Sequence, residues 1–103
     1  MIRHIVLLRF KESVTAAEKA AHYAELEGLK GHLKGILGSQ FGPNVSPEEP
    51  VIHGFKDGFW FDFTDEAARD AYLADPAHQA AGAKLVANAE GGRDGLVVFD
   101  MKV

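Results

Sequence analysis

Large apolar side chains occupy both faces of three predicted strands, and this pattern limits how the chain can fold. The first strand covers residues 2–10, with Ile2, Val6 and Leu8 on one face and Ile5 and Leu7 on the other. Two later segments, residues 58–63 and 96–101, have the same apolar character. Successive side chains of a strand point to opposite sides of a sheet. Both sides of a sheet built from these strands therefore need to be covered.

Helical segments alternate with the strands along the chain. Thr15 and Glu18 have the spacing of a capping box, which predicts a helix that continues to about Leu33. A short strand follows this helix, and the proline-rich segment 43–50 is expected to be a loop. The complete order is strand, helix, strand, strand, helix, strand. It predicts a single α+β domain over residues 1–103, with ferredoxin-like βαββαβ topology and a four-stranded antiparallel sheet.

The predicted helices can cover only one face of such a sheet. An antiparallel sheet with one face in water normally carries polar residues on that face. The apolar residues on the second face would form a larger exposed patch than most monomers tolerate. The sequence therefore predicts a homodimer, in which two sheets pack through the faces that the helices leave uncovered, giving an α+β barrel.

Composition excludes several other classes of function. A net charge of −4 and the absence of a Lys/Arg cluster argue against nucleic acid as a partner. The chain has no cysteine, which excludes disulfides, thiolate metal sites and a cysteine nucleophile. No apolar run is long enough to cross a membrane, and the first residues do not resemble a signal peptide. We therefore expect a cytoplasmic protein with neither nucleic acid nor membrane as a partner.

The second helix is interrupted in a way that places two reactive side chains near each other. Thr64 is the predicted N-cap of this helix, and Pro76 breaks it. Asp75 and Pro76 are suited to cap and begin a new helix, so His78 falls in its first turn. The helix dipole disfavours an imidazolium there, which predicts a neutral imidazole. Tyr72, on the other side of the break, would then serve as an acid beside this base.

Four segments in the same order resemble the stress-responsive A/B barrel (Dabb) family: residues 1–11, 42–48, 71–79 and 96–100. The resemblance implies a dimeric α+β barrel of ferredoxin-like subunits, in agreement with the fold expected from patterning. The family includes a plant polyketide cyclase that uses neither cofactor nor metal. Tyr72 and His78 match the catalytic residues of that enzyme, and His4 matches a residue of its pocket. Asp57 and Leu26 stand where the cyclase has a pocket histidine and a pocket tyrosine, so its substrate is not transferred to this chain.

The matched residues are consistent with acid/base chemistry that needs no cofactor. His78 would remove a proton next to a carbonyl group, and Tyr72 would donate a hydrogen bond to the enolate or oxyanion. His4 would orient His78 or the substrate. Asp57, if it points the same way, would orient an imidazole or raise its pKa. Apolar walls, suited to a small phenolic or polyketide-like ligand, are expected from Leu8, Leu26, Leu29, Leu33, Phe59 and Phe61.

Three functions remain open at this point. The chain is a cofactor-independent lyase, cyclase or isomerase, a non-catalytic stress-responsive binding protein, or a cofactor-free monooxygenase. In the non-catalytic case His78 is a polar surface residue and Tyr72 a core residue. A cavity that reaches Tyr72, His78 and His4 together would favour catalysis. No metal site is predicted, because no two histidines have the short spacing of a zinc motif.

Overall fold

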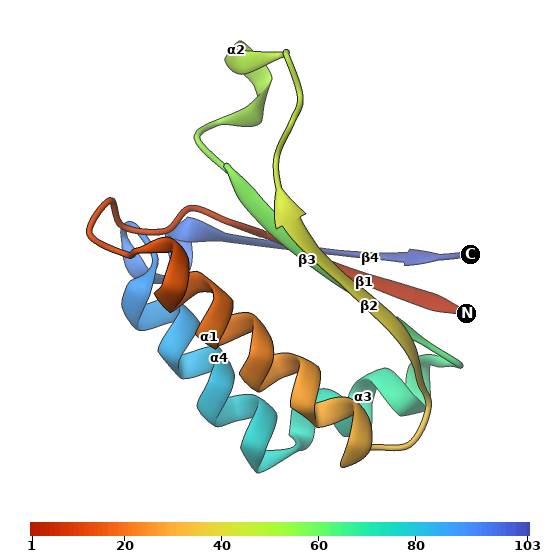
Figure 1. Cartoon of the computed structure of the whole chain (residues 1–103). Coiled ribbons are helices and arrows are strands. Elements are labelled where there is room, and N and C mark those ends of the chain that lie inside the picture. Colours follow the sequence, from red (N-terminus) through yellow and green to blue (C-terminus); the bar gives the residue numbers. More distant parts are fainter.

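The computed structural model describes residues Met1–Val103, and it consists of one four-stranded sheet with helices on one face (Figure 1). In chain order the elements are β1 (Ile2–Leu8), α1 (Ala16–Glu27), the 3₁₀ turn η1 (Gly28–Gly31), β2 (Ile36–Pro43), α2 (Glu49–Ile52), β3 (Asp57–Phe63), α3 (Glu66–Ala74), α4 (Pro76–Asn88), the 3₁₀ turn η2 (Gly92–Gly95) and β4 (Leu96–Lys102). This order confirms the ferredoxin-like βαββαβ topology expected from the sequence.

The strands lie in the order β2-β3-β1-β4, and all neighbours are antiparallel. β1 is therefore a central strand that pairs with both β3 and β4. Its register places His4 opposite Phe61 on β3 and opposite Asp100 on β4. Because these three residues face the same side of the sheet, the pairing brings together residues from the beginning, middle and end of the chain.

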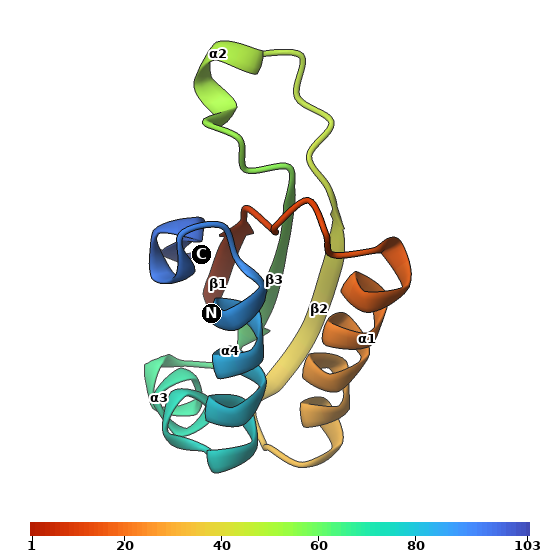
Figure 2. The ribbon, with the colours of Figure 1, turned by 90° about the vertical axis from the view of Figure 1, so that its left-hand side faces the viewer.

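The core lies between the sheet and the helices, and aromatic side chains fill much of it. α1 and α4 run side by side across one face of the sheet, and α3 covers the adjoining end (Figures 1 and 2). Phe59, Phe61 and Phe63 project from β3 into this layer and are almost completely buried. They pack against Leu26 of α1 and Tyr72 of α3, which are also buried. A row of aromatic residues on β3 thus forms part of the surface on which the helices pack.

Two helix boundaries differ from those expected. Thr15 and Glu18 form the predicted capping box, but α1 ends at Glu27 and continues only as a 3₁₀ turn to Gly31, well before Leu33. A glycine at each end of this turn weakens the helix there. The N-cap of α3 is Asp65 rather than Thr64, because its carboxylate is the group that accepts a hydrogen bond from the third amide of the helix, Ala68, at 2.9 Å.

The connection between β2 and β3 extends away from the sheet, on the side opposite to the helices (Figures 1 and 2). This arm, residues 44–56, contains the short helix α2 in the region expected to be a loop. Val45 at 88% and Val51 at 62% are among the most exposed apolar residues of the chain.

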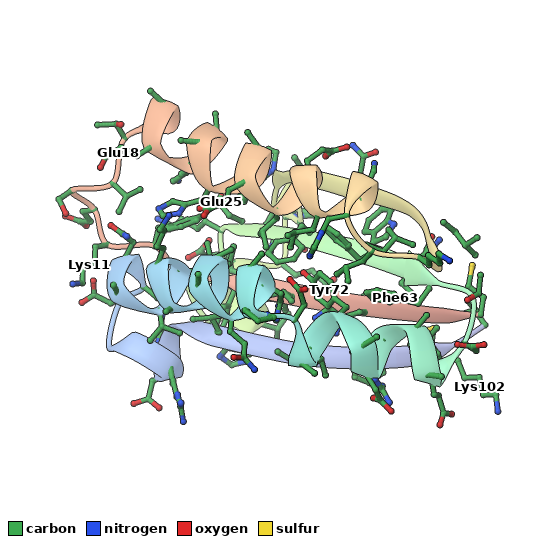
Figure 3. The ribbon with its side chains drawn as sticks, turned by 90° about the horizontal axis from the view of Figure 1, so that it is seen from below. Lys11, Glu18, Glu25, Phe63, Tyr72 and Lys102 are labelled. Carbon is green, nitrogen blue, oxygen red and sulfur yellow. The ribbon has the colours of Figure 1, made fainter.

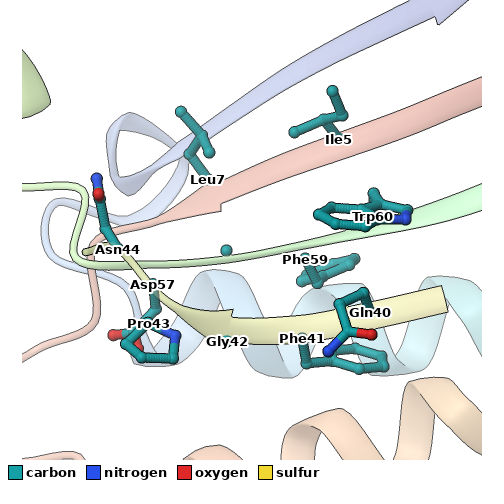
Figure 4. A pocket seen from close by; sticks show the side chains of 11 residues that line it. Ile5, Leu7, Gln40, Phe41, Gly42, Pro43, Asn44, Asp57, Phe59 and Trp60 are labelled. Carbon is teal, nitrogen blue, oxygen red and sulfur yellow. The ribbon is translucent and has the colours of Figure 1, made fainter. Parts of the chain in front are cut away.

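The face of the sheet without helices is largely apolar, as the strand pattern predicted. The side chains directed to this open face include Ile5, Leu7, Trp60, Val97, Phe99 and Met101. Phe99 is 55% exposed and Met101 is 43% exposed. A hollow of about 610 Å³ opens on this face at Gly42, beside Leu7 and Trp60 (Figure 4). Nothing in the chain covers this surface.

Candidate active site

A cavity of about 730 Å³ lies between the sheet and α4. Its size is within the range of small-molecule sites, and most of its lining is apolar. Side chains that can exchange protons or donate hydrogen bonds gather at one end of it: His4, Tyr72, His78 and Asp100. Such an arrangement, an apolar cavity with a few convergent polar groups, is typical of a ligand-binding or active site.

The break between α3 and α4 fixes the position of His78. Asp75 caps α4 as predicted, since one of its carboxylate oxygens accepts hydrogen bonds from the amides of Ala77 and His78, at 3.0 and 3.1 Å. Its other oxygen is 2.9 Å from Nε2 of His32. These contacts hold the first turn of α4 against the end of α3. As a result, the His78 and Tyr72 rings lie with their centroids 4.0 Å apart. Figure 3 shows Tyr72 beside the helix junction.

His78 is held in an environment that favours its neutral form. The pKa of His78 lies below its ordinary value of 6.5, first because burial destabilises the charged ring and second because His4 lies nearby. The sequence predicted a neutral ring from the helix dipole, whereas burial is the main cause. The backbone of Leu73 lies near the ring and favours its charged form, but the contact does not have the geometry of a hydrogen bond. Nδ1 of His78 is therefore buried without a hydrogen-bond partner. Nε2 is the ring nitrogen that a ligand can reach.

Tyr72 has the opposite character and remains a proton donor. Its ring packs on Phe61 and Phe63, with centroid distances of 5.3 and 5.1 Å. Burial raises the pKa of Tyr72 far above its ordinary value of 10. Its hydroxyl forms no hydrogen bond within the chain, and the surrounding protein does not enclose it completely. It can therefore donate a hydrogen bond to a molecule in the cavity.

His4 belongs to a hydrogen-bonded network with Asp100 and Arg69 that the sequence did not predict. Nδ1 of His4 is 2.6 Å from Asp100, and the other oxygen of Asp100 accepts a hydrogen bond of 2.6 Å from Arg69. Burial alone would raise the pKa of Asp100, but the hydrogen bonds from Arg69 and His4 outweigh it and the pKa lies below its ordinary value. An ionised Asp100 only accepts hydrogen bonds, so it holds the proton of His4 on Nδ1. Asp100 faces the helices, on the same side of the sheet as His4. A carboxylate at such a position of an apolar strand is the sequence signal that could have identified it.

The remaining predicted site residues divide into two groups. Leu26 and Phe59 line the cavity with His4, Tyr72 and His78. Three others are buried in the core but are not part of the cavity lining: Leu8, Leu29 and Phe61. Leu33 packs against the core, is only partly buried and is also absent from the lining.

Asp57 lies outside the cavity. It is opposite Leu8 in the sheet, four residues along β1 from His4, or about 13 Å away at the usual rise of a strand. Its carboxylate accepts a hydrogen bond of 2.9 Å from Nζ of Lys19. The structure therefore does not bring Asp57 to either imidazole, and the expectation that it orients one is wrong for this subunit.

No three His, Asp or Glu side chains lie close enough together to hold a metal ion. None of the helices combines the length and the apolar character that crossing a membrane requires.

The topology of the sheet and the placement of the helices define a ferredoxin-like α+β protein. More particularly, the chain belongs to the stress-responsive A/B barrel domain (Dabb) family, because the sequence model of that family matches residues 2–103. The family resemblance seen in the sequence is thereby confirmed.

Solved structures with the same fold cover nearly the whole chain. A dimeric ferredoxin-like protein of unknown function from Jannaschia sp. CCS1 is 36% identical, with a TM-score of 0.90, and the match covers 99% of this chain and 98% of that one. Arabidopsis thaliana At3g17210 is 22% identical, with a TM-score of 0.88 and coverage of 100% and 95%. A hydroxynitrile lyase from Passiflora edulis is 17% identical, with a TM-score of 0.84 and coverage of 99% and 92%. No curated protein matches the chain in sequence.

The lowered pKa of His78 makes stability depend on pH in a defined window. Unfolded, the ring titrates near 6.5, whereas the folded protein binds its proton only at lower pH. Below about pH 6.5 the unfolded state therefore binds more protons, and the free energy of unfolding falls as the pH decreases towards the folded pKa. We expect His78→Gln to make this decrease shallower between pH 7 and 5, measured by urea denaturation. His53→Gln, on the exposed arm, is the control, and an unchanged slope in His78→Gln would contradict the assignment.

Proposed function

We propose that this protein is a cofactor-independent enzyme of the lyase, cyclase or isomerase type, acting on a small carbonyl-containing, phenolic or polyketide-like molecule. The observation that carries the proposal is the pair formed by Tyr72 and His78, whose ring centroids are 4.0 Å apart at the end of an apolar cavity. His4 lines the same end of the cavity, and its ring centroid is 6.0 Å from that of Tyr72. Burial tunes the pair in opposite directions, which gives a neutral base beside a protonated acid.

The reaction step that this geometry supports is removal of a proton next to a carbonyl group. Nε2 of His78 takes the proton, and the electron pair of the broken C–H bond moves onto the carbonyl oxygen. Tyr72 donates a hydrogen bond to the resulting enolate oxygen, in a cavity where exclusion of water strengthens such a bond. The imidazolium then returns the proton to the product, so the enzyme ends in its starting state. Nε2 of His4, whose Nδ1 is held by Asp100, is a further hydrogen-bonding group for the substrate.

The hydroxynitrile lyase from Passiflora edulis supports the lyase form of this proposal only at the level of the fold, because the identity is 17%. A cyanohydrin is nevertheless a suitable test compound, since its cleavage to a carbonyl compound and cyanide begins with removal of a hydroxyl proton. The same base and the same hydrogen-bond donor would serve this reaction.

A binding role without catalysis is the second candidate function. The observation that favours it is the burial of Tyr72, whose side chain is only 1% exposed and packs among core phenylalanines. In that case the cavity holds a ligand but the ligand leaves unchanged.

Proton abstraction can be tested without the natural substrate. We expect the protein to accelerate exchange of the α-protons of a benzyl ketone, such as 1-phenylpropan-2-one, in D₂O followed by NMR, or cleavage of mandelonitrile. His78→Ala should lower the rate about 10²–10⁴-fold, the usual contribution of a general base. Tyr72→Phe should lower it about 10²–10³-fold, as loss of an oxyanion donor does. His53→Ala, on the arm, should keep the full rate, whereas equal rates in all variants would exclude this chemistry.

We also propose that the chain forms a homodimer through the open face of the sheet. The apolar residues on that face lack any cover within the subunit, and the similar protein from Jannaschia sp. CCS1 is described as dimeric. The hollow at Gly42 offers space for side chains of a second copy (Figure 4).

Phe99→Glu should convert the dimer into a monomer, because it places a charge in the middle of the proposed apolar interface. Ala20→Glu, on the exposed side of α1, is the matched control and should remain dimeric. Size-exclusion chromatography with light scattering measures both against the subunit mass of 11.2 kDa. A wild-type protein with the mass of one subunit at micromolar concentration would contradict the proposal.

A further inference from the structure

The cavity beside α4 is elongated. The positions of its lining residues along α4 indicate its length. Lining residues recur at helical spacing along one side of α4: His78, Gln79, Gly82, Ala83 and Val86. Val86 is eight positions beyond His78, so this stripe is about 12 Å long at the rise of an α-helix. A ligand that fills the cavity is therefore a long molecule rather than a compact one.

The two ends of the cavity differ in chemical character. The acid/base pair and His4 lie at the end where α4 begins. Arg93 lies at the other end, on the 3₁₀ turn that follows α4, and it is the one Lys or Arg side chain in the lining. Its guanidinium forms no hydrogen bond or ion pair within the chain, whereas Asp100, the one carboxylate in the lining, is occupied by Arg69 and His4. Arg93 is thus available to bind an anion from outside.

The lining between these two ends is apolar, and it includes a glycine in the middle of α4. The residues that form it are Val6, Leu26, Phe59, Leu85, Leu96 and Val98. Gly82 lies in the middle of α4, where glycine lowers helix stability relative to alanine. A Cβ atom at this position would meet no atom within 4 Å, so close packing of the subunit does not require a glycine. What the missing side chain does provide is open space in the cavity.

We propose that the ligand is an elongated, mainly apolar carboxylate that binds with its anionic end at Arg93. Its chain passes over Gly82, and its other end reaches His78 and Tyr72. A single guanidinium suits a singly charged carboxylate better than a phosphate, which would need more donors. Only the placement of the reacting group at His78 rests on the function proposed above, since binding itself needs no turnover.

The test compares octanoate with 1-octanol, which has the same chain length but no charge, in NMR titrations of the ¹⁵N-labelled protein. We expect octanoate to bind about tenfold more tightly than 1-octanol, the effect of one charge-assisted hydrogen bond. The amides of Gly82 and Arg93 should shift during the titration. Arg93→Gln should remove the preference for octanoate, and Lys11→Gln, which deletes a charge outside the cavity, should retain it.

A second variant tests the path of the chain. Gly82→Leu should abolish binding of both compounds while its melting temperature stays at or above that of the wild type, because leucine is a better helix former. Equal affinities of the wild type for octanoate and 1-octanol, no binding of either, or an unchanged preference in Arg93→Gln would overturn the proposal. Octanoate binding without any α-proton exchange would refute the proposed chemistry and leave the ligand assignment intact. Exchange of α-protons without a preference for octanoate would refute the ligand assignment and leave the proposed chemistry intact.

Discussion

The antiparallel pairing of β1 with both β3 and β4 is the interaction on which the rest of the structure depends. It sets the row of phenylalanines on β3 beneath the helices and, in the same register, places His4 beside Asp100. A shift of one residue would move His4 to the open face and separate it from Tyr72. The position of the candidate site is therefore a consequence of how the central strand pairs, rather than of any local motif.

Burial explains how the site combines a proton acceptor with a proton donor. The apolar surroundings disfavour the charged forms of His78 and Tyr72, which keeps His78 neutral and Tyr72 protonated. Asp100 is the exception, because Arg69 and His4 supply enough hydrogen bonds to keep it ionised. One low-dielectric region thus provides a proton acceptor, a proton donor and a fixed negative charge within a small volume.

The sequence predicted the fold well because the relevant signals are local. Alternation of apolar residues identified the strands, and Asp75 with Pro76 marked the start of α4 and the position of His78. The residues that it missed or misplaced depend on contacts between distant segments. Asp100 lies 96 positions from His4, and only the register of β1 and β4 makes them neighbours. Asp57 was expected near the imidazoles, but the register with β1 places it four residues further along the sheet.

The central claim is that the subunit holds a neutral His78 against a protonated Tyr72 at physiological pH. The most direct measurement is an NMR titration that follows the ring signals of each histidine, with His78 assigned by comparison with His78→Gln. The account predicts that His78 is neutral at pH 7 and that its midpoint of protonation lies below pH 6.5. A His78 ring that is half protonated at or above pH 6.5 would contradict it.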